Sequence, residues 1–329
     1  MKLTPETVAV AAQLACLLEA SAEKPGNVTP SRSFLDMNYG DFLRSAAAIG
    51  PEIARAGERS VGATILAAVT ATRRWTQANT NLGIILLLVP LAKAAFQSKK
   101  VQREESQDEM ESYPFLAQWP SELTPSTVYT LRAEGPLVAG TGPLLSTELR
   151  ANASAILHQL TVDDAALTYA AIRLAMPGGL GSNVEHDVHA EPTVTLREAM
   201  ASATGRDSIA AEYLSDYAIT FECGLPALEA ALSRGASVEQ AVVQTFLQLL
   251  ATVPDTLIAR KRGRAIAESV AAQAGRVLAA GGVFSPAGQH AIKALDAELR
   301  VNGHSLNPGA TADLSAATLF VALLIGVLK

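Results

Sequence analysis

The sequence predicts an all-α protein, built as a single domain of about a dozen helices. Its 329 residues are 49% hydrophobic but only 5% aromatic, so the core must consist mainly of Ala, Leu, Val and Ile. Most apolar segments are long, rich in Ala and spaced as on a helix, and alternating strand patterns are scarce. We expect one domain because the candidate functional motifs run from Lys24 to Asp313 and would have to meet at one site.

In the first part of the chain, helix boundaries can be predicted one by one. Pro5 suits the first turn of a helix that reaches about Ala22, and Pro25-Gly26 must end it. Asp41 can cap the next helix, which Gly50-Pro51 should interrupt.

Further helix starts are predicted by residue pairs with capping-box spacing: Thr161 with Asp164, Thr195 with Glu198, and Ser237 with Gln240. Ser285-Pro286 should open another helix, and Gly303 stands where a helix C′ glycine would. These are folding signals rather than functional ones.

Residues 97–143 differ in kind from the rest. A run of charged residues opens the segment, and five prolines follow at positions 114, 120, 125, 136 and 143. We expect a solvated helix end and an irregular surface insertion. A flexible lid is the alternative.

Composition limits the partners. The net charge of −6 and the pI of about 5.5 argue against a nucleic-acid or anionic membrane surface. The longest apolar runs, Leu82 to Leu91 and Thr318 to Leu328, are shorter than the roughly 20 residues of a membrane helix. The N-terminus lacks the pattern of a secretory signal, and Cys16 and Cys223 form no disulfide or zinc pattern. We expect a cytoplasmic protein with small-molecule partners, and association as a homodimer stays open.

Polar motifs at helix edges carry the functional signal. Gly and Pro allow backbone N–H groups to approach an anion, while Asn, Thr and Asp supply short hydrogen-bonding groups or a metal ligand. This combination is typical of phosphate and sugar binding. The motifs are Lys24-Pro25-Gly26-Asn27-Val28, Asn79-Thr80-Asn81-Leu82-Gly83, Pro254-Asp255-Thr256 and Asn307-Pro308-Gly309-Ala310-Thr311-Ala312-Asp313-Leu314.

Each motif also has a structural explanation. The first could be a helix stop and turn, and the second could be an N-cap, although three polar residues exceed what one cap needs. Asp255 and Asp313 are candidates for metal or base roles, but either could cap a helix.

Two other acidic clusters are weaker candidates. Asp187 lies between His186 and His189, whose spacing alone does not predict zinc. The pair Asp163-Asp164 resembles metal-binding aspartates, yet Thr161 makes a helix start the better interpretation.

Taken in order, the motifs resemble the triphosphoribosyl-dephospho-CoA synthase family, which transfers a triphosphoribosyl group from ATP and releases adenine. The resemblance runs over most of the chain. The matching pieces are Lys24-Pro25-Gly26, Asn79-Thr80, Asp255-Thr256 followed by Arg262-Gly263, and Pro308-Gly309 with Ala312-Asp313-Leu314.

The chain also departs from the family pattern. The family's Leu-Val-Asp is replaced by Asn27-Val28-Thr29-Pro30. Of its Gly-Ala-His-x-Asp-Met, only Asp36-Met37 is kept, within Phe34-Leu35-Asp36-Met37. Asn81-Leu82-Gly83 stands where the family has His-Lys-Gly, and the Gly-Ala-Arg-Gly-Glu element is missing. The acceptor is therefore less certain than the scaffold.

The resemblance implies roles for particular residues. Asp255 and Asp313 would act as catalytic groups and hold Mg²⁺, with ATP as substrate, and Lys24 and Arg262 would neutralise the triphosphate. The implied nucleotide and phosphate contacts also include Gly26, Asn27, Asn79, Thr80, Asn81, Asp187, Thr256, Pro308 and Gly309.

Three alternatives remain: a related ribosyl or phosphoribosyl transfer in another cofactor pathway, such as that of a one-carbon pterin, an ADP-ribosylglycohydrolase-like hydrolase, or a nucleotide-binding protein without turnover. Because one polyphosphate-sugar ligand must be bound from several helix ends, we expect Lys24, Asn79, Asn81, Asp255 and Asp313 to line one cavity.

Overall fold

The structure, a computed structural model, describes residues 3–97, 145–176, 187–301 and 303–328. Within these ranges it is a single globular all-α domain, which confirms the predicted fold class; the only β feature there is an isolated bridge between Thr29 and Arg32. The predicted insertion at 97–143 lies, except for Gln97, outside the described residues. The fourteen α-helices of the described ranges are α1 (Pro5–Ser21), α2 (Tyr39–Ile53), α3 (Val61–Arg73), α4 (Leu82–Phe96), α6 (Ser146–His158), α7 (Val162–Ala175), α8 (Leu196–Ala201), α9 (Ser208–Leu214), α10 (Leu225–Ser233), α11 (Val238–Thr252), α12 (Thr256–Arg262), α13 (Arg264–Ala279), α14 (Pro286–Leu299) and α15 (Gly309–Ile325), joined by a π-helical turn (Ile219–Gly224) and a 3-10 turn (Gly282–Phe284).

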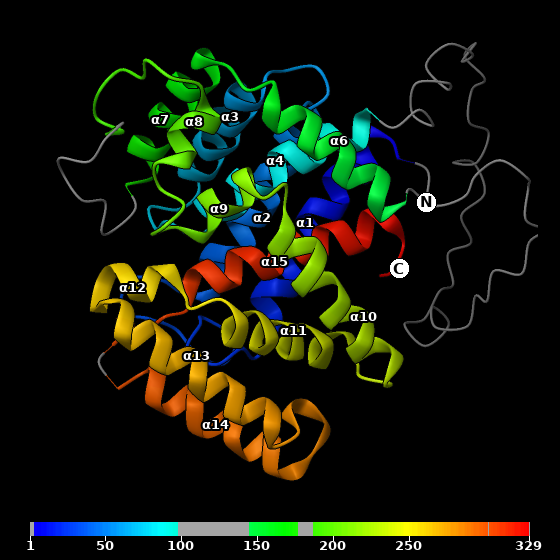
Figure 1. Ribbon diagram of the computed structural model, residues 1–329, viewed down its shortest axis with the longest axis vertical. Helices are drawn as coiled ribbons and strands as arrows, with labels where there is room; N and C mark the ends of the chain where they lie inside the picture. The colour runs from blue at the N-terminus through cyan, green and yellow to red at the C-terminus, as the bar shows by residue number, and fades with distance from the viewer. Residues whose placement is uncertain (1–2, 98–144, 177–186, 302, 329) are drawn as a thin grey trace, which may run out of the picture.

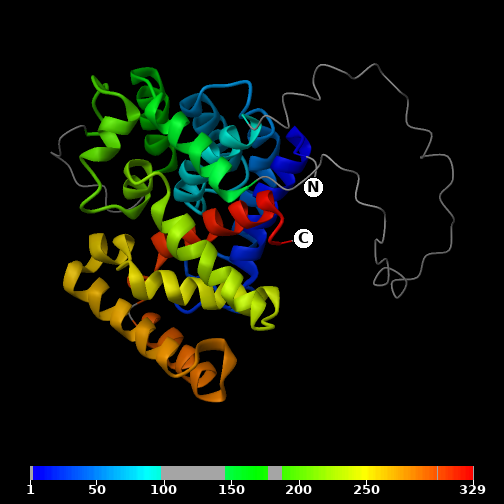
Figure 2. The ribbon, with the colours of Figure 1, turned by 45° about the vertical axis from the view of Figure 1, so that its right-hand side comes forward.

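The C-terminal helix α15 runs through the centre of the molecule (Figures 1 and 2). It packs against α1, α4, α10 and α11, and it is buried on every side because its sequence is apolar all round. Helices α3, α7 and α8 form one end of the molecule, whereas α12, α13 and α14 form the other. The N-terminal ends of α4 and α15 therefore lie between these two groups of helices.

Local signals place most helix starts correctly. The capping boxes at Thr161, Thr195 and Ser237 form as predicted, Ser285 caps α14, and α1 begins at Pro5. Because these signals depend on residues three apart in sequence, they need no tertiary information.

The expected boundaries of α2 were wrong. The helix begins at Tyr39 with Asn38 as its N-cap, and it continues through Gly50-Pro51 to Ile53. Pro51 lacks the N–H group that would bond the carbonyl of Ala47. The side-chain amide of Gln13, on α1, donates to that carbonyl instead at 3.1 Å, so the proline is tolerated.

A second proline lies within α4, and a side chain from another helix again bonds the carbonyl that it leaves free. Pro90 cannot bond the carbonyl of Leu86, and the buried hydroxyl of Tyr213 donates to that oxygen at 2.7 Å. The hydroxyl of Tyr217 donates to the next carbonyl, that of Leu87, also at 2.7 Å. These two hydrogen bonds stabilise α4, whose first turn lines the site described below.

Among the described residues, no single helix has the length and apolar composition required to cross a membrane; the bent pair α11 and α12 meets that test only jointly.

Candidate active site

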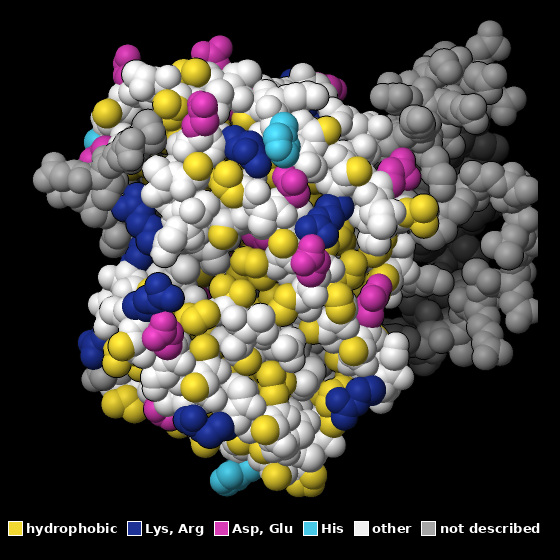
Figure 3. Space-filling view, in the orientation of Figure 1, with side chains coloured by type: hydrophobic (Ala, Val, Ile, Leu, Met, Phe, Trp, Pro, Cys, Tyr) yellow, Lys and Arg dark blue, Asp and Glu magenta, His cyan; other side chains and the backbone are white. Residues whose placement is uncertain are grey.

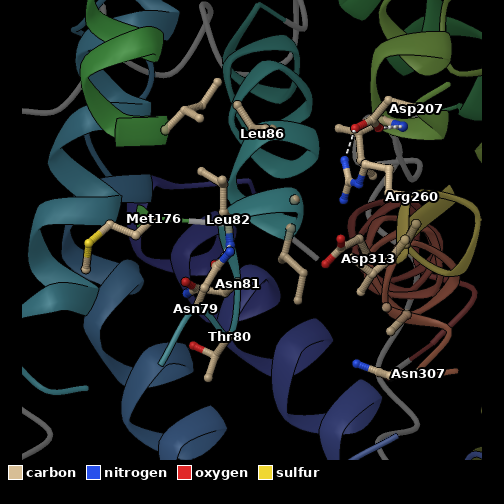
Figure 4. Close-up of a pocket in the computed structure, with 18 of the residues that line it drawn as sticks. Asn79, Thr80, Asn81, Leu82, Leu86, Met176, Asp207, Arg260, Asn307 and Asp313 are labelled. Atoms are coloured by element: carbon tan, nitrogen blue, oxygen red, sulfur yellow. Dashed lines mark hydrogen bonds and ion pairs between the residues drawn. The ribbon is translucent and has the colours of Figure 1, made fainter. Parts of the chain in front are cut away.

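A cavity of about 890 Å³ lies between the two ends of the molecule. Its walls come from α1, α4, α9, α12 and α15, from the loop after α1 and from the segment before α4 (Figure 4). On the face of the molecule shown in Figure 3, charges of both signs are scattered around an apolar centre. The cavity thus gathers segments that are distant in sequence.

One wall is the N-terminal end of α4. Asn81 is its N-cap residue, and Asn79 Oδ1 accepts from the N–H of Leu82 at 3.3 Å. The N–H groups of Gly83 and Ile84 have no hydrogen-bond partner among the described residues. A helix start with free N–H groups attracts anions, because those groups and the helix dipole are both positive there.

Asp313 faces this helix start from α15. Its side chain lines the cavity, is only partly exposed, and makes no hydrogen bond or ion pair with any described residue. Gly83 is required opposite it, because a Cβ at that position would collide with the Asp313 carboxylate. Burial raises the pKa of Asp313 well above its ordinary value, and the nearby carboxylates of Glu19, Asp255 and Asp207 raise it further.

The opposite wall carries positive charge. Arg260 and Lys261 lie on α12, and Arg260 Nη1 contacts Asp207 Oδ2 at 2.7 Å. Figure 4 shows this pair across the cavity from Asn79 and Asn81, with Asp313 between them. A negatively charged ligand that reached the free helix start would therefore lie close to two cationic side chains.

The cavity floor contains a buried ion pair that sequence analysis did not predict. Glu19 lines the cavity, and its Oε1 lies 3.1 Å from Nζ of Lys24. Lys24 is 1% exposed, and its ammonium group also donates to the backbone carbonyls of Glu19 and Ala22. The Lys24 ammonium group therefore pairs with Glu19 and does not face the cavity.

Asp255 lies behind the cavity wall and joins two helices. Its Oδ1 accepts from the N–H groups of Leu257 and Ile258 at 2.9 and 3.0 Å, which caps α12. Its Oδ2 accepts from the N–H and hydroxyl groups of Thr311 at 2.7 and 2.8 Å, in the first turn of α15. Both oxygens are therefore occupied by protein donors.

The structure brings together about half of the predicted site. Of the five residues expected to share a cavity, Asn79, Asn81 and Asp313 line it, whereas Lys24 and Asp255 do not. The other predicted residues that line it are Asn27, Thr80, Asp187 and Gly309.

The remaining predicted residues lie outside the lining, where all but Arg262 have structural roles. The N–H of Gly26 donates to Asp296 Oδ1 at 2.8 Å, and the Thr256 hydroxyl lies 3.2 Å from that of Ser208. Pro308 is the N-cap residue of α15, and Arg262 is exposed at the end of α12.

Sequence reasoning missed several cavity residues. Arg260 and Lys261 directly precede Arg262, the residue that the resemblance selected, and the direction of the short helix α12 decides which of the three face inward. Glu19 and His304 carry no local signal, because only the packing of their segments brings them to the cavity, and Phe34 stood out in the sequence only as a departure from the family motif.

No group of three or more His, Cys, Asp or Glu side chains within the described ranges is placed to hold a metal ion by itself. Mg²⁺ usually needs only one or two carboxylates when it also binds substrate phosphates. Asp313 has a free carboxylate that fits this requirement, and Asp255 does not, because its oxygens are already bonded.

Comparison with known proteins gives one consistent result. The model of the family "ATP:dephospho-CoA triphosphoribosyl transferase" matches residues 5–121 and 131–328. A Klebsiella pneumoniae 2-(5''-triphosphoribosyl)-3'-dephosphocoenzyme-A synthase is 38% identical over 102 residues, which cover 31% of this chain and 36% of that protein. A Vibrio cholerae protein provisionally described by the same name is 36% identical over 135 residues, or 41% of this chain and 42% of the relative.

The fold is also found in a solved structure. A crystal structure from Archaeoglobus fulgidus, provisionally described as a triphosphoribosyl-dephospho-CoA synthase, has a TM-score of 0.57 and 24% identity to this chain. The match covers 86% of this chain and 99% of the archaeal one.

Proposed function

The chain belongs to the ATP:dephospho-CoA triphosphoribosyl transferase family, and we propose from this premise that it transfers a triphosphoribosyl group from ATP to a hydroxyl group of a nucleotide acceptor of the dephospho-CoA type. Adenine is the second product. The observation that carries the proposal is the cavity in which a free helix start, a carboxylate without a hydrogen-bond partner among the described residues, and two cationic side chains face one another.

Binding of the triphosphate is assigned to the α4 start and to α12. The free N–H groups of Gly83 and Ile84 bind phosphate oxygens, and Arg260 and Lys261 neutralise the remaining charge. This arrangement compensates for the lysine that the second motif lacks.

The chemical step is a substitution at C1′ of the ATP ribose. The acceptor oxygen forms a bond to C1′ as the bond from C1′ to the adenine nitrogen breaks, and the leaving adenine takes up a proton. Asp313 accepts the proton of the attacking hydroxyl, because its carboxylate faces the cavity and no described protein group occupies its oxygens. Its charge also stabilises the positive character that develops at C1′.

Mg²⁺ is part of the proposal, and when bound it would be held by the Asp313 carboxylate. It would offset phosphate charge in a cavity that also holds the carboxylates of Glu19 and Asp207.

The test is adenine release from ATP, measured with and without dephospho-CoA. We expect release only when the acceptor is present, and a loss of about 100-fold or more in Asp313→Asn because it removes the base. Asp163→Asn, an exposed acidic residue at the start of α7, is the matched control and should keep full activity.

Two other results would contradict the proposed transferase activity. Adenine release that requires only water would identify a hydrolase. ATP binding without any adenine release, with dephospho-CoA and with other hydroxyl-bearing nucleotides, would contradict the transferase proposal.

A further inference from the structure

An aromatic pair lies where the cavity meets solvent. The rings of Phe34 and His304 stack with centroids 4.9 Å apart and an interplanar angle of 29°. Both residues line the cavity and both are partly exposed, with 38% of the His304 side chain accessible. Asp36 Oδ2 lies 3.7 Å from His304 Nε2, so a carboxylate stands at the edge of the stack.

The stack does not serve the hydrophobic core. Phe34 and its neighbour Met37 are not among the described apolar residues that form the core or pack against it, yet both line the cavity. Aromatic residues make up only 5% of this chain. An aromatic ring held against the cavity and away from the core is therefore better explained by a ligand than by packing.

The two loops that carry the rings are fixed to each other without a ligand. Asn27 Nδ2 donates to Asn307 Oδ1 at 2.6 Å, and Arg300 Nη2 donates to the carbonyl of Asn27 at 2.6 Å. Within the first loop the N–H of Phe34 donates to the carbonyl of Met37 at 2.8 Å. A ligand that stacks here does not have to order the loops first, which favours binding.

We propose that the Phe34–His304 stack binds the adenine base of a nucleotide substrate. The planar base extends the stack, and the Asp36 carboxylate accepts a hydrogen bond from the exocyclic amino group. The identity of the ligand as an adenine nucleotide rests on the proposed function, in which both ATP and an acceptor of the dephospho-CoA type carry adenine.

The position of the stack agrees with the rest of the cavity. The α4 start, where Asn81 and Leu82 are buried, lies deeper in the cavity than the partly exposed aromatic pair, and the cationic side chains of α12 line the same cavity. A nucleotide bound in this direction places its sugar between the two subsites, and its base can leave toward solvent after the bond to C1′ breaks.

The test compares ligands with and without a base. Calorimetric titration of ATP, dephospho-CoA and inorganic tripolyphosphate is performed on the full chain with Mg²⁺, and on the variants Phe34→Ala, Phe34→Tyr and His304→Ala. Leu35→Ala is the matched control, because Leu35 is on the same loop and fully exposed.

We expect Phe34→Ala and His304→Ala to weaken an adenine nucleotide about tenfold and to leave tripolyphosphate unchanged. Phe34→Tyr should restore binding, and Leu35→Ala should not alter it. If only ATP is weakened, the stack holds the donor base; if only dephospho-CoA is weakened, it holds the acceptor base.

The proposal is overturned if both alanine variants bind both nucleotides as wild type does, or if tripolyphosphate is weakened equally. The proposed function fails separately, if wild type binds neither ATP nor tripolyphosphate. In that case titration with adenosine tests the stack alone. The stacking proposal is overturned if adenosine does not bind, or if it binds wild type and Phe34→Ala with equal affinity. A thermal melt of each variant shows whether it is folded.

Discussion

At the residue scale, Asp313 is held in a site that opposes its ionisation. Burial and three neighbouring carboxylates raise its pKa, and no described residue donates a hydrogen bond to it. A group with these surroundings favours function at the expense of stability.

We predict that Asp313→Asn stabilises the protein at neutral pH in metal-free buffer. The carboxyl is neutral in both states below its unfolded pKa of about 4, so wild type and variant should then be equally stable. As pH rises through the raised pKa of the folded state, wild type loses stability that the variant keeps. Each unit of pKa difference corresponds to about 1.4 kcal/mol.

Urea denaturation of both proteins between pH 4 and pH 8 measures this difference. A gap that grows with pH in favour of Asp313→Asn supports the prediction. A variant less stable than wild type at pH 8 would show that Asp313 is stabilised by contacts in the folded protein.

Gly83 supports a second prediction at this scale. In Gly83→Ala the new Cβ collides with the Asp313 carboxylate and must displace it, so we expect adenine release to fall about tenfold or more while the fold is kept. Gly275→Ala is the control, because a Cβ at this position in α13 meets nothing within 4 Å. It should leave activity unchanged and stabilise the helix by about 0.5–1 kcal/mol. Equal activity in both variants would contradict the assigned geometry.

At the element scale, two prolines that should interrupt helices are accommodated by side chains from other helices. Gln13 donates a hydrogen bond to the carbonyl that Pro51 leaves free, and Tyr213 donates one to the carbonyl that Pro90 leaves free. In each case the side chain replaces a hydrogen bond that the helix has lost. These contacts join α1 to α2 and α9 to α4.

We predict that Tyr213→Phe costs about 1–3 kcal/mol of unfolding free energy, because the buried carbonyl of Leu86 loses its donor. In the background Pro90→Ala the backbone N–H of Ala at position 90 can serve that carbonyl, so the cost should fall by at least half. A double-mutant cycle from urea denaturation measures the coupling.

Tyr217→Phe is the control for this cycle. The Tyr217 hydroxyl donates to the carbonyl of Leu87, and the helical N–H that bonds this carbonyl does not belong to residue 90. The cost of Tyr217→Phe should therefore be the same with and without Pro90. Additive effects of Tyr213→Phe and Pro90→Ala would contradict the explanation.

At the scale of the whole molecule, Asp255 connects the α12 end of the structure to the central helix. One carboxylate oxygen caps α12, and the other bonds the N–H and hydroxyl groups of Thr311 on α15. The cationic wall and Asp313 are on these two helices, so this side chain joins the two elements that carry them.

We predict that Asp255→Asn destabilises the protein by about 1–3 kcal/mol, although Asn is as good an N-cap as Asp. The amide has one acceptor oxygen, so its nitrogen must face donors on either α12 or α15. Thermal unfolding measures the effect, with the exposed Asp163→Asn as control. An unchanged melting temperature would show that the contact to Thr311 is dispensable.

Much of the fold could be predicted from sequence, because helix formation depends on signals that are close together in the chain. Apolar spacing and capping residues identify helices such as α7, α11 and α14 without tertiary information. Part of the site could also be predicted, since Asn79, Asn81 and Asp313 are polar residues at the starts of apolar helices, where an exposed helix end attracts anions.

Only the tertiary structure decided which polar residues face the cavity. Lys24 and Asp255 have the same local features as Asn79 and Asp313, but neither side chain is free for a ligand. Lys24 pairs with Glu19 at the end of α1, and Asp255 accepts hydrogen bonds from Thr311, which folding brings near. Arg260, rather than Arg262, reaches the cavity because of the direction of α12. The sequence by itself determined an all-helical fold with polar residues at several helix starts. Long-range packing determined which of its charges remain free for a ligand, because a buried charge takes the nearest partner in space rather than in sequence.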